Sequence, residues 1–250
     1  MNIVCLTALG VGGATLIGAV IGFIFKNMTH RFSDITLSFA AGVMLAAAVL
    51  GLVVPSVEYG GKYGLITTVA GIFVGAFCLN LIDKIVPHIH SVIDGNSEHK
   101  SNTKLNKVLL FVMAIAIHNL PEGIAAGVGF GSGNMSQALI IAGGIALQNI
   151  PEGMVIISPM LAAGVTPKKT FVFATLTGLV EVIGTFIGYF AVSIATVILP
   201  FALAFAGGTM LYVISDEMIP ETHSHGCHNG ATYALLAGFC IMLVFDVLLG

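Results

Sequence analysis

Long apolar segments alternate with short polar ones along almost the whole chain of 250 residues. Each apolar segment approaches or exceeds the roughly 20 residues that a helix needs to cross a bilayer. The segments are continuous, whereas the strands of a membrane barrel would alternate in polarity. The pattern therefore predicts an all-α integral membrane protein, a single transmembrane domain over residues 1–250. Its eight predicted spans are 3–25, 35–54, 64–86, 107–130, 136–161, 170–190, 196–219 and 230–249.

The composition excludes most other classes of protein. Hydrophobic residues make up 57% of the chain and charged residues only 8%, so a soluble fold would lack the polar side chains to cover its surface. A soluble enzyme, a nucleic-acid binder and a disordered chain are all excluded on this ground. The 31 glycines include pairs four residues apart inside the spans, which predict close helix contacts. These pairs are Gly71 and Gly75, Gly123 and Gly127, and Gly184 and Gly188.

The basic residues predict the orientation. All but one of the nine Lys and Arg residues flank the connectors after spans one, three and five, which lie on one side. The exception is Lys62. Because basic residues favour the cytoplasmic side, we expect both termini outside the cytoplasm, in a protein of the cell membrane. The residues that carry this prediction are Lys26, Arg31, Lys84, Lys100, Lys104, Lys107, Lys168 and Lys169.

Two related polar motifs interrupt the middle of spans four and five. Residues 118–123 read His-Asn-Leu-Pro-Glu-Gly, and residues 148–153 read Gln-Asn-Ile-Pro-Glu-Gly. An ionisable group at mid-bilayer costs on the order of 2.5–3.5 kcal/mol, so two such motifs indicate a functional site. His118 and Glu122 are four residues apart and share a helix face, as do Gln148 and Glu152. The short connector between the spans predicts that the two faces meet at one depth.

The prolines of these motifs loosen both helices. Pro121 cannot donate to the carbonyl of Ile117, and Pro151 cannot donate to that of Leu147. Irregular backbone at this depth is tolerated where it lines a polar cavity. Two carboxylates in one small volume would repel each other, and a divalent cation would remove that penalty. The motifs therefore predict a metal site, although each pair alone is also consistent with structural hydrogen bonding.

Other spans add candidate ligands to this site. Glu181 lies in the middle of span six, and Met44 lies near the middle of span two. Nitrogen, oxygen and thioether ligands together suit Zn²⁺, Cd²⁺, Fe²⁺ or Mn²⁺ better than Mg²⁺. From the residues alone, Met44 is more typical of a methionine that fills a gap in the core than of a metal ligand. The predicted metal ligands are Met44, His118, Asn119, Glu122, Gln148, Asn149, Glu152 and Glu181.

A second group of polar residues lies toward the predicted cytoplasmic side. Asp216 and Glu217 lie just inside span seven, and His223 and His225 follow it; all four are candidates for an exit path or gate. The connector 87–106 is predicted to be a polar cytoplasmic loop. Its histidines are candidate metal ligands, or members of an ordinary solvated loop with weak metal affinity. They are His88, His90 and His99.

With these motifs, the sequence resembles the ZIP family of divalent metal transporters, most closely its bacterial GufA-type branch. The family pattern His-Asn-x-Pro-Glu-Gly is met in full at 118–123, whereas Gln148 stands where many members have His. The resemblance implies a binuclear site, uptake into the cytoplasm, inverted symmetry between spans 1–3 and 6–8, and a homodimer. One implied metal uses Met44, His118, Glu122, Gln148 and Glu152, and the other Asn119, Asn149 and Glu181 with the two motif glutamates bridging.

The leading hypothesis is a secondary transporter of divalent transition metals, chiefly Zn²⁺, that is not an enzyme. The sequence contains no nucleotide-binding motif, so we expect an ion gradient to drive transport. A metal exporter with the same ligands is one alternative. A metal-dependent intramembrane enzyme is another, although no His-Glu-x-x-His string is present. A purely structural membrane subunit is the third.

Overall fold

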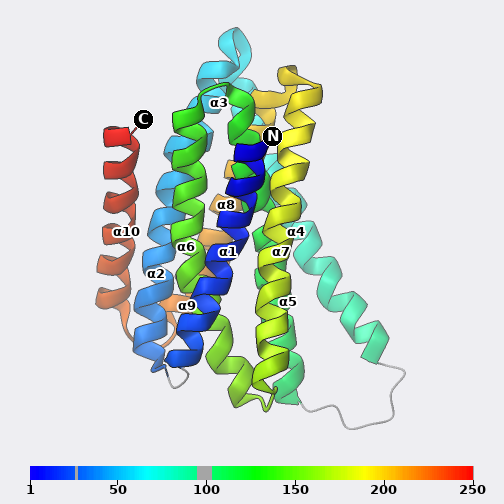
Figure 1. Cartoon of the computed structure of the whole chain (residues 1–250), viewed down its shortest axis with the longest axis vertical. Coiled ribbons are helices and arrows are strands. Elements are labelled where there is room, and N and C mark those ends of the chain that lie inside the picture. The colour runs from blue at the N-terminus through cyan, green and yellow to red at the C-terminus, as the bar shows by residue number, and fades with distance from the viewer. Residues whose placement is uncertain (26–27, 95–102, 250) are drawn as a thin grey trace.

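A computed structural model describes the backbone of residues 1–25, 28–94 and 103–249, and the side chains of these ranges except 86–111 and 114. Every regular element in these ranges is a helix (Figure 1). Elements η1 and η5 are π-helical, and η2 to η4 are short 3₁₀ turns. The elements are α1 (Asn2–Ile24), α2 (His30–Ala46), η1 (Ala47–Val53), α3 (Val54–Tyr59), η2 (Gly61–Tyr63), α4 (Gly64–Asp94), α5 (Thr103–Gly129), η3 (Phe130–Ser132), α6 (Met135–Ala162), α7 (Pro167–Ile194), η4 (Thr196–Ile198), α8 (Leu199–Val213), η5 (Ile214–Met218), α9 (Ile219–His223) and α10 (His228–Leu249).

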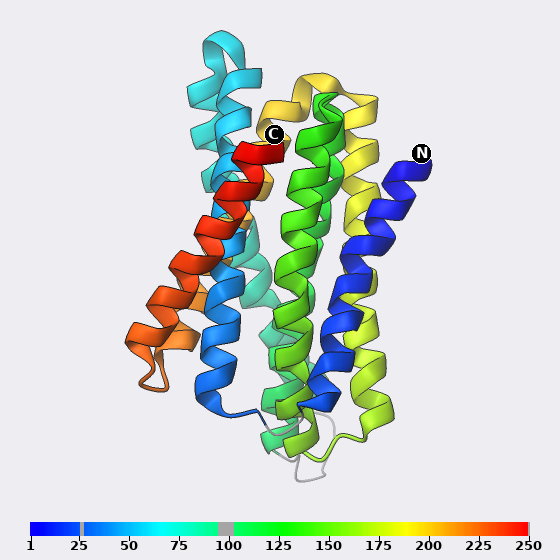
Figure 2. The ribbon, with the colours of Figure 1, turned by 60° about the vertical axis from the view of Figure 1, so that its left-hand side comes forward.

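The predicted all-α membrane fold is confirmed. Seven helical segments within the described residues are long and apolar enough to cross a membrane. Helix α5, with 27 residues and the first polar motif, supplies the other predicted span. The two ends of the described chain lie at the same end of the bundle, as an even number of crossings requires (Figure 1 and Figure 2). We call this the terminal end and the other the opposite end.

Two predicted boundaries need correction. Span two starts earlier than residue 35, because the Thr29 side chain caps α2 by accepting a hydrogen bond from the Phe32 amide at 3.2 Å. The predicted loop 87–106 also begins too early, since α4 continues to Asp94. Pro87 removes only the bond to the Asp83 carbonyl, which a helix can survive. His88 and His90 are therefore on a helical backbone, and His99 lies outside the described residues.

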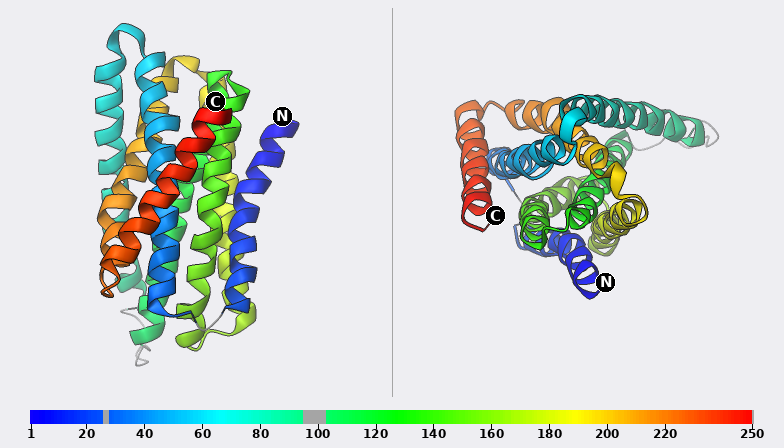
Figure 3. Two further views of the ribbon diagram at one scale, coloured as in Figure 1. Left: turned by 90° about the vertical axis from the view of Figure 1, so that its left-hand side faces the viewer. Right: turned by 90° about the horizontal axis from the view of Figure 1, so that it is seen from above.

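The helices pack as two groups. Helix α1 packs on α6 and α7, and α5 packs on α7 and α6, which forms one bundle. Helix α2 packs on α10, and α4 packs on α8, which forms the other; both groups are visible end-on in Figure 3. Exchanging spans 1–3 with spans 6–8, and span four (α5) with span five (α6), turns the α1–α6 contact into α7–α5, and the α2–α10 contact into α8–α4. The packing therefore has the pattern of the expected inverted repeat.

Spans two and seven are broken in the same way. In each, an α-helix passes into a π-helical turn and then into a short helix with proline at its start. Pro55 cannot donate to the carbonyl of Gly51, and Pro220 cannot donate to that of Asp216. Such π turns are frequent at functional sites. Here the turn of span seven places Asp216 and Glu217 on irregular backbone.

The motif glycines bring neighbouring helices into close contact. A Cβ atom added at Gly123 would lie 2.3 Å from the carbonyl oxygen of Glu181, and one at Gly153 would lie 2.2 Å from that of Thr15. These contacts hold α5 against α7 and α6 against α1. They confirm the tight packing predicted from the glycine spacing, and they position the partner helices' polar side chains beside the motifs.

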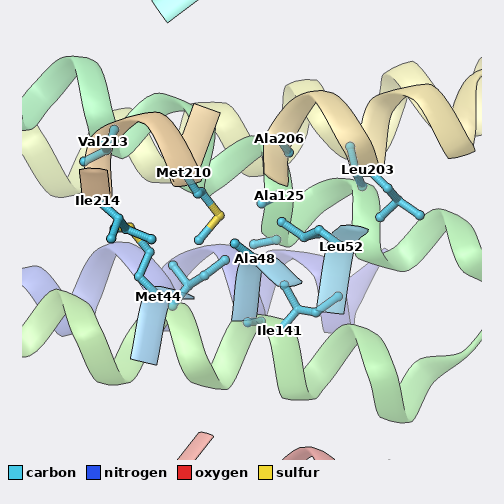
Figure 4. Close-up of a cluster of buried hydrophobic side chains, with 14 of the residues drawn as sticks. Met44, Ala48, Leu52, Ala125, Ile141, Leu203, Ala206, Met210, Val213 and Ile214 are labelled. Carbon is cyan, nitrogen blue, oxygen red and sulfur yellow. The ribbon is translucent and has the colours of Figure 1, made fainter. Parts of the chain in front are cut away.

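An apolar cluster runs through the interior between the two bundles (Figure 4), and its members from the start of α8 and from η1 lie toward the terminal end. Leu52, Ile141 and Leu203 come from three different spans and are almost fully buried. Met44 and Met210 belong to the same cluster, and Figure 4 shows Met44 beside Ile214, away from Leu52 and Leu203. Close-packed side chains leave no room for a hydrated ion, so this cluster closes the interior toward the terminal end.

Candidate metal site

The two motifs lie on α5 and α6 at facing positions in the interior. Pro121 and Pro151 are both inside helices, so each helix lacks one backbone hydrogen bond at its motif. The polar side chains of both motifs are buried, and Glu122 is only 1% exposed. The predicted hairpin of spans four and five therefore brings its polar residues to one depth of the bundle.

A cavity of about 460 Å³ connects these residues with the opposite end of the bundle. At its inner end it is lined by Met44, His118, Glu122 and Glu152. Toward the opposite end its lining continues through Asp216, Glu217, Pro220, Glu221 and Ser224. Five carboxyl groups thus line a single space, which suits a cation and would repel an anion.

Many polar atoms at or beside the inner end have no hydrogen-bond partner in the described part of the chain. They include both carboxylate oxygens of Glu122, one of Glu152, and the amide nitrogen and oxygen of Gln148. The amide oxygens of Asn119 and Asn149 belong to the same set. Buried polar groups are nearly always paired, so such a concentration of free acceptors calls for a positively charged partner. A divalent cation fits this donor set.

Glu181 sits at the centre of a second polar cluster behind the cavity. Its Oε1 accepts a hydrogen bond from Thr15 Oγ1 at 2.7 Å and another from the Asn119 amide. Its Oε2 accepts one from Asn149 Nδ2 at 2.6 Å. Because the two amide nitrogens point at Glu181, their oxygens are left for another partner. Sequence reasoning missed Thr15, whose only signal was a hydroxyl between the glycines of span one.

A third cluster lies between the motif and the opposite end. His118 Nε2 is 2.8 Å from Glu217 Oε1, without the alignment of a hydrogen bond. Asp83 joins them, so that ligand atoms of all three residues lie within 4.8 Å of one another. Sequence reasoning did not include Asp83 among the candidate residues and so missed this grouping. The available signal was an acid near the end of span three, level with the acids of span seven.

The remaining predicted residues are distributed differently. His223 bonds within α9 and to α10, since Nδ1 lies 2.8 Å from the Ile219 carbonyl and Nε2 3.3 Å from Thr232 Oγ1. His225 is not at the inner cavity but beside Asp34, at 3.1 Å. Met44 lines the cavity next to His118, in agreement with the ligand role and equally with core packing.

Comparison with known proteins agrees with this arrangement. A family profile described as ZIP zinc transporter matches residues 94–246. The chain is 37% identical over 245 residues to the zinc transporter GufA of Myxococcus xanthus, covering 96% of each chain. It is 39% identical over 248 residues to the zinc transporter ZupT of Chlorobaculum parvum, covering 93% of this chain and 92% of the relative. It is 33% identical over 249 residues to the zinc transporter ZIPB of Bordetella bronchiseptica, covering 95% of this chain and 78% of the relative.

A helical membrane bundle with a buried, carboxylate-lined cavity open toward one end defines a membrane transporter of cations. The chain belongs to the ZIP family of metal transporters. The resemblance drawn from the two motifs is confirmed, as is the prediction of a divalent metal transporter rather than an enzyme.

Proposed function

We propose that the protein carries Zn²⁺ across the cell membrane into the cytoplasm. The observation that carries the proposal is the cavity that joins the unpaired glutamates of the two motifs to one end of the bundle. Arg31, Lys84 and Lys168 are near that end, which the positive-inside rule assigns to the cytoplasm. The relatives named above are zinc transporters, which supports Zn²⁺ as the cargo.

The donor set supports two adjacent metal positions. The first would use the thioether, imidazole, amide and carboxylate groups of Met44, His118, Glu122, Gln148 and Glu152. The second would use Asn119, Asn149 and Glu181, with the two motif glutamates shared between both positions. Glu181 is already bound by three donors, so occupying the second position would require some of these hydrogen bonds to rearrange. The first position is therefore the one that accepts the ion more readily.

The arrangement supports transport by alternating access. The apolar cluster closes the terminal side while the cavity is open to the opposite side, so the described conformation faces the proposed cytoplasm. His118 belongs both to the first metal position and to the cluster with Asp83 and Glu217. It can therefore pass an ion from the motif glutamates to the exit acids. A rigid-body shift between the two bundles would open the other side.

Several finer features belong to the same proposal. Cd²⁺, Fe²⁺ and Mn²⁺ suit the donor types and are proposed as weaker substrates. Large exposed apolar side chains such as Phe73, Phe77 and Leu236 fit contact with lipid tails. A homodimer and an ion gradient as driving force are retained as proposals. His99 lies outside the described residues. Metal binding by His88, His90 and His99 stays a prediction.

Membrane vesicles of both orientations test the direction of transport. Right-side-out vesicles that contain the protein should take up Zn²⁺ with saturable kinetics, and everted vesicles should release it. An exporter with the same ligands would give the opposite result. Competition by Cd²⁺, Fe²⁺ and Mn²⁺ in the same assay would rank the metals. Zinc flux equal to that of vesicles without the protein would contradict the proposal.

A further inference from the structure

The segment after α9 passes near the start of α2 (Figure 2). Between them, outside the central cavity, one carboxylate and two imidazoles lie together. Asp34 is only 4% exposed, although it lies near the beginning of α2. Its Oδ1 is 3.1 Å from His225 Nδ1. Its Oδ2 is buried and has no hydrogen-bond partner among the described residues. The interaction with His225 therefore gives a partner to only one of the two carboxylate oxygens.

His30 completes the group. It precedes Asp34 by four residues and therefore lies on the same face of α2. Its ring stacks on that of His225, with centroids 4.6 Å apart and planes inclined by 22°. Stacked rings carry their nitrogens side by side, so His30 would have to turn about its side-chain torsions to aim a nitrogen at the carboxylate.

These groups have the chemistry of a metal site. Carboxylate oxygen and imidazole nitrogen both bind Zn²⁺ at about 2.0–2.2 Å, which places two ligand atoms on one tetrahedral ion about 3.3 Å apart. The 3.1 Å between Asp34 and His225 is close to this spacing. We propose that Asp34 and His225, joined by His30, form a further binding site for a divalent transition metal.

The position suggests a role, which rests on the proposed zinc transport. Ser224 lines the outer part of the central cavity, and its hydroxyl lies 3.1 Å from His225 Nδ1. Leu37 lines the same cavity and follows Asp34 by about one helical turn. The site is therefore at the mouth of the cavity, where a released ion would be held before it enters the cytoplasm.

The surroundings predict moderate affinity. Arg31, His225 and Cys227 line an adjoining cavity of about 380 Å³. The positive charge of Arg31 opposes a cation nearby and favours its release. An ion here would also tie the start of α2 to the segment after α9, two parts of the same bundle. Binding at this site therefore need not hinder a shift between the bundles.

Zinc binding by the purified full chain tests the site separately from transport. The Glu122→Gln/Glu152→Gln protein, with its central site removed, is dialysed against buffered Zn²⁺, and the metal bound per chain is measured. Asp34→Asn or His225→Gln in this background should each lower the bound Zn²⁺ by about one ion per chain. His30→Gln should weaken binding roughly tenfold, as expected for a ligand that has to reorient.

His223→Gln is the matched control, because this imidazole precedes His225 by two residues but has both nitrogens in hydrogen bonds. It should leave the bound Zn²⁺ unchanged. Gel filtration and thermal unfolding confirm that each variant is folded. Equal zinc content in the background protein and in its folded Asp34→Asn and His225→Gln forms would overturn the site and leave a hydrogen-bonded Asp–His pair. A third outcome is that the substitutions remove one bound Zn²⁺ per chain while the wild-type protein shows no zinc transport. That result would retain the site and refute only its role in release.

Discussion

His118 Nε2 lies 2.8 Å from Glu217 Oε1, so a side chain of the first motif reaches the acids at the cavity's opposite end. The same imidazole lines the cavity beside Glu122 and Glu152. A ligand shared by two neighbouring sets of carboxylates lowers the barrier between them, because the ion need not be fully rehydrated on the way. In the proposed pathway this relationship would connect the central site with the acids at the exit.

Asp83 is expected to act in release rather than in capture. In Asp83→Asn the cluster with His118 and Glu217 loses one negative charge, whereas the motif glutamates keep theirs. The maximal rate of zinc transport should fall roughly tenfold with little change in KM. Asp246→Asn, in α10, is the control and should transport normally. A large rise in KM with an unchanged maximal rate would place Asp83 at the capture site instead.

Thr15 is expected to stabilise the apo protein through Glu181. Thr15→Val keeps the shape of the side chain but removes the hydrogen bond of 2.7 Å to Oε1. Since hydrogen bonds between membrane helices average about 0.6 kcal/mol, the free energy of unfolding should fall by on the order of 1 kcal/mol. Thr175→Val, whose hydroxyl bonds only to the Phe171 carbonyl of its own helix, is the matched control. Thermal unfolding in detergent gives the comparison, and equal destabilisation of the two variants would argue against the role of Thr15.

Gly123 is expected to tolerate no side chain. The added methyl group of Gly123→Ala would meet the Glu181 carbonyl at 2.3 Å and push α5 away from α7. Overpacking of this kind costs roughly 1–3 kcal/mol, and the displacement of Glu181 should also reduce transport. Gly143→Ala, where nothing in the described structure lies within 4 Å of the added atom, should be harmless. Normal stability and transport in Gly123→Ala would show that this close contact is dispensable.

The sequence predicted the membrane fold because hydropathy over a span is a sum of many residues and is robust to errors at single positions. The central site was predictable because ionisable groups are rare at mid-bilayer, so Glu122, Glu152 and Glu181 were conspicuous. Thr15 and Asp83 were not, since a hydroxyl in a span and an acid at its end are both common. Asp34 and His225 are far apart in sequence, and only the fold brings them together. The continuation of α4 past Pro87 was not predictable, because one proline removes only one backbone hydrogen bond and does not by itself decide where a helix ends.

The most direct test of the central claim is zinc uptake into proteoliposomes that contain the Glu122→Gln/Glu152→Gln protein. Both side chains keep their size but lose their charge, so the cavity loses the groups best able to hold a divalent ion. Glu58→Gln, an exposed carboxylate on α3, is the matched control. We predict saturable uptake by the wild type and by Glu58→Gln, and none above empty liposomes for the double variant. Equal uptake by all three proteins would contradict a transport path through the two motifs.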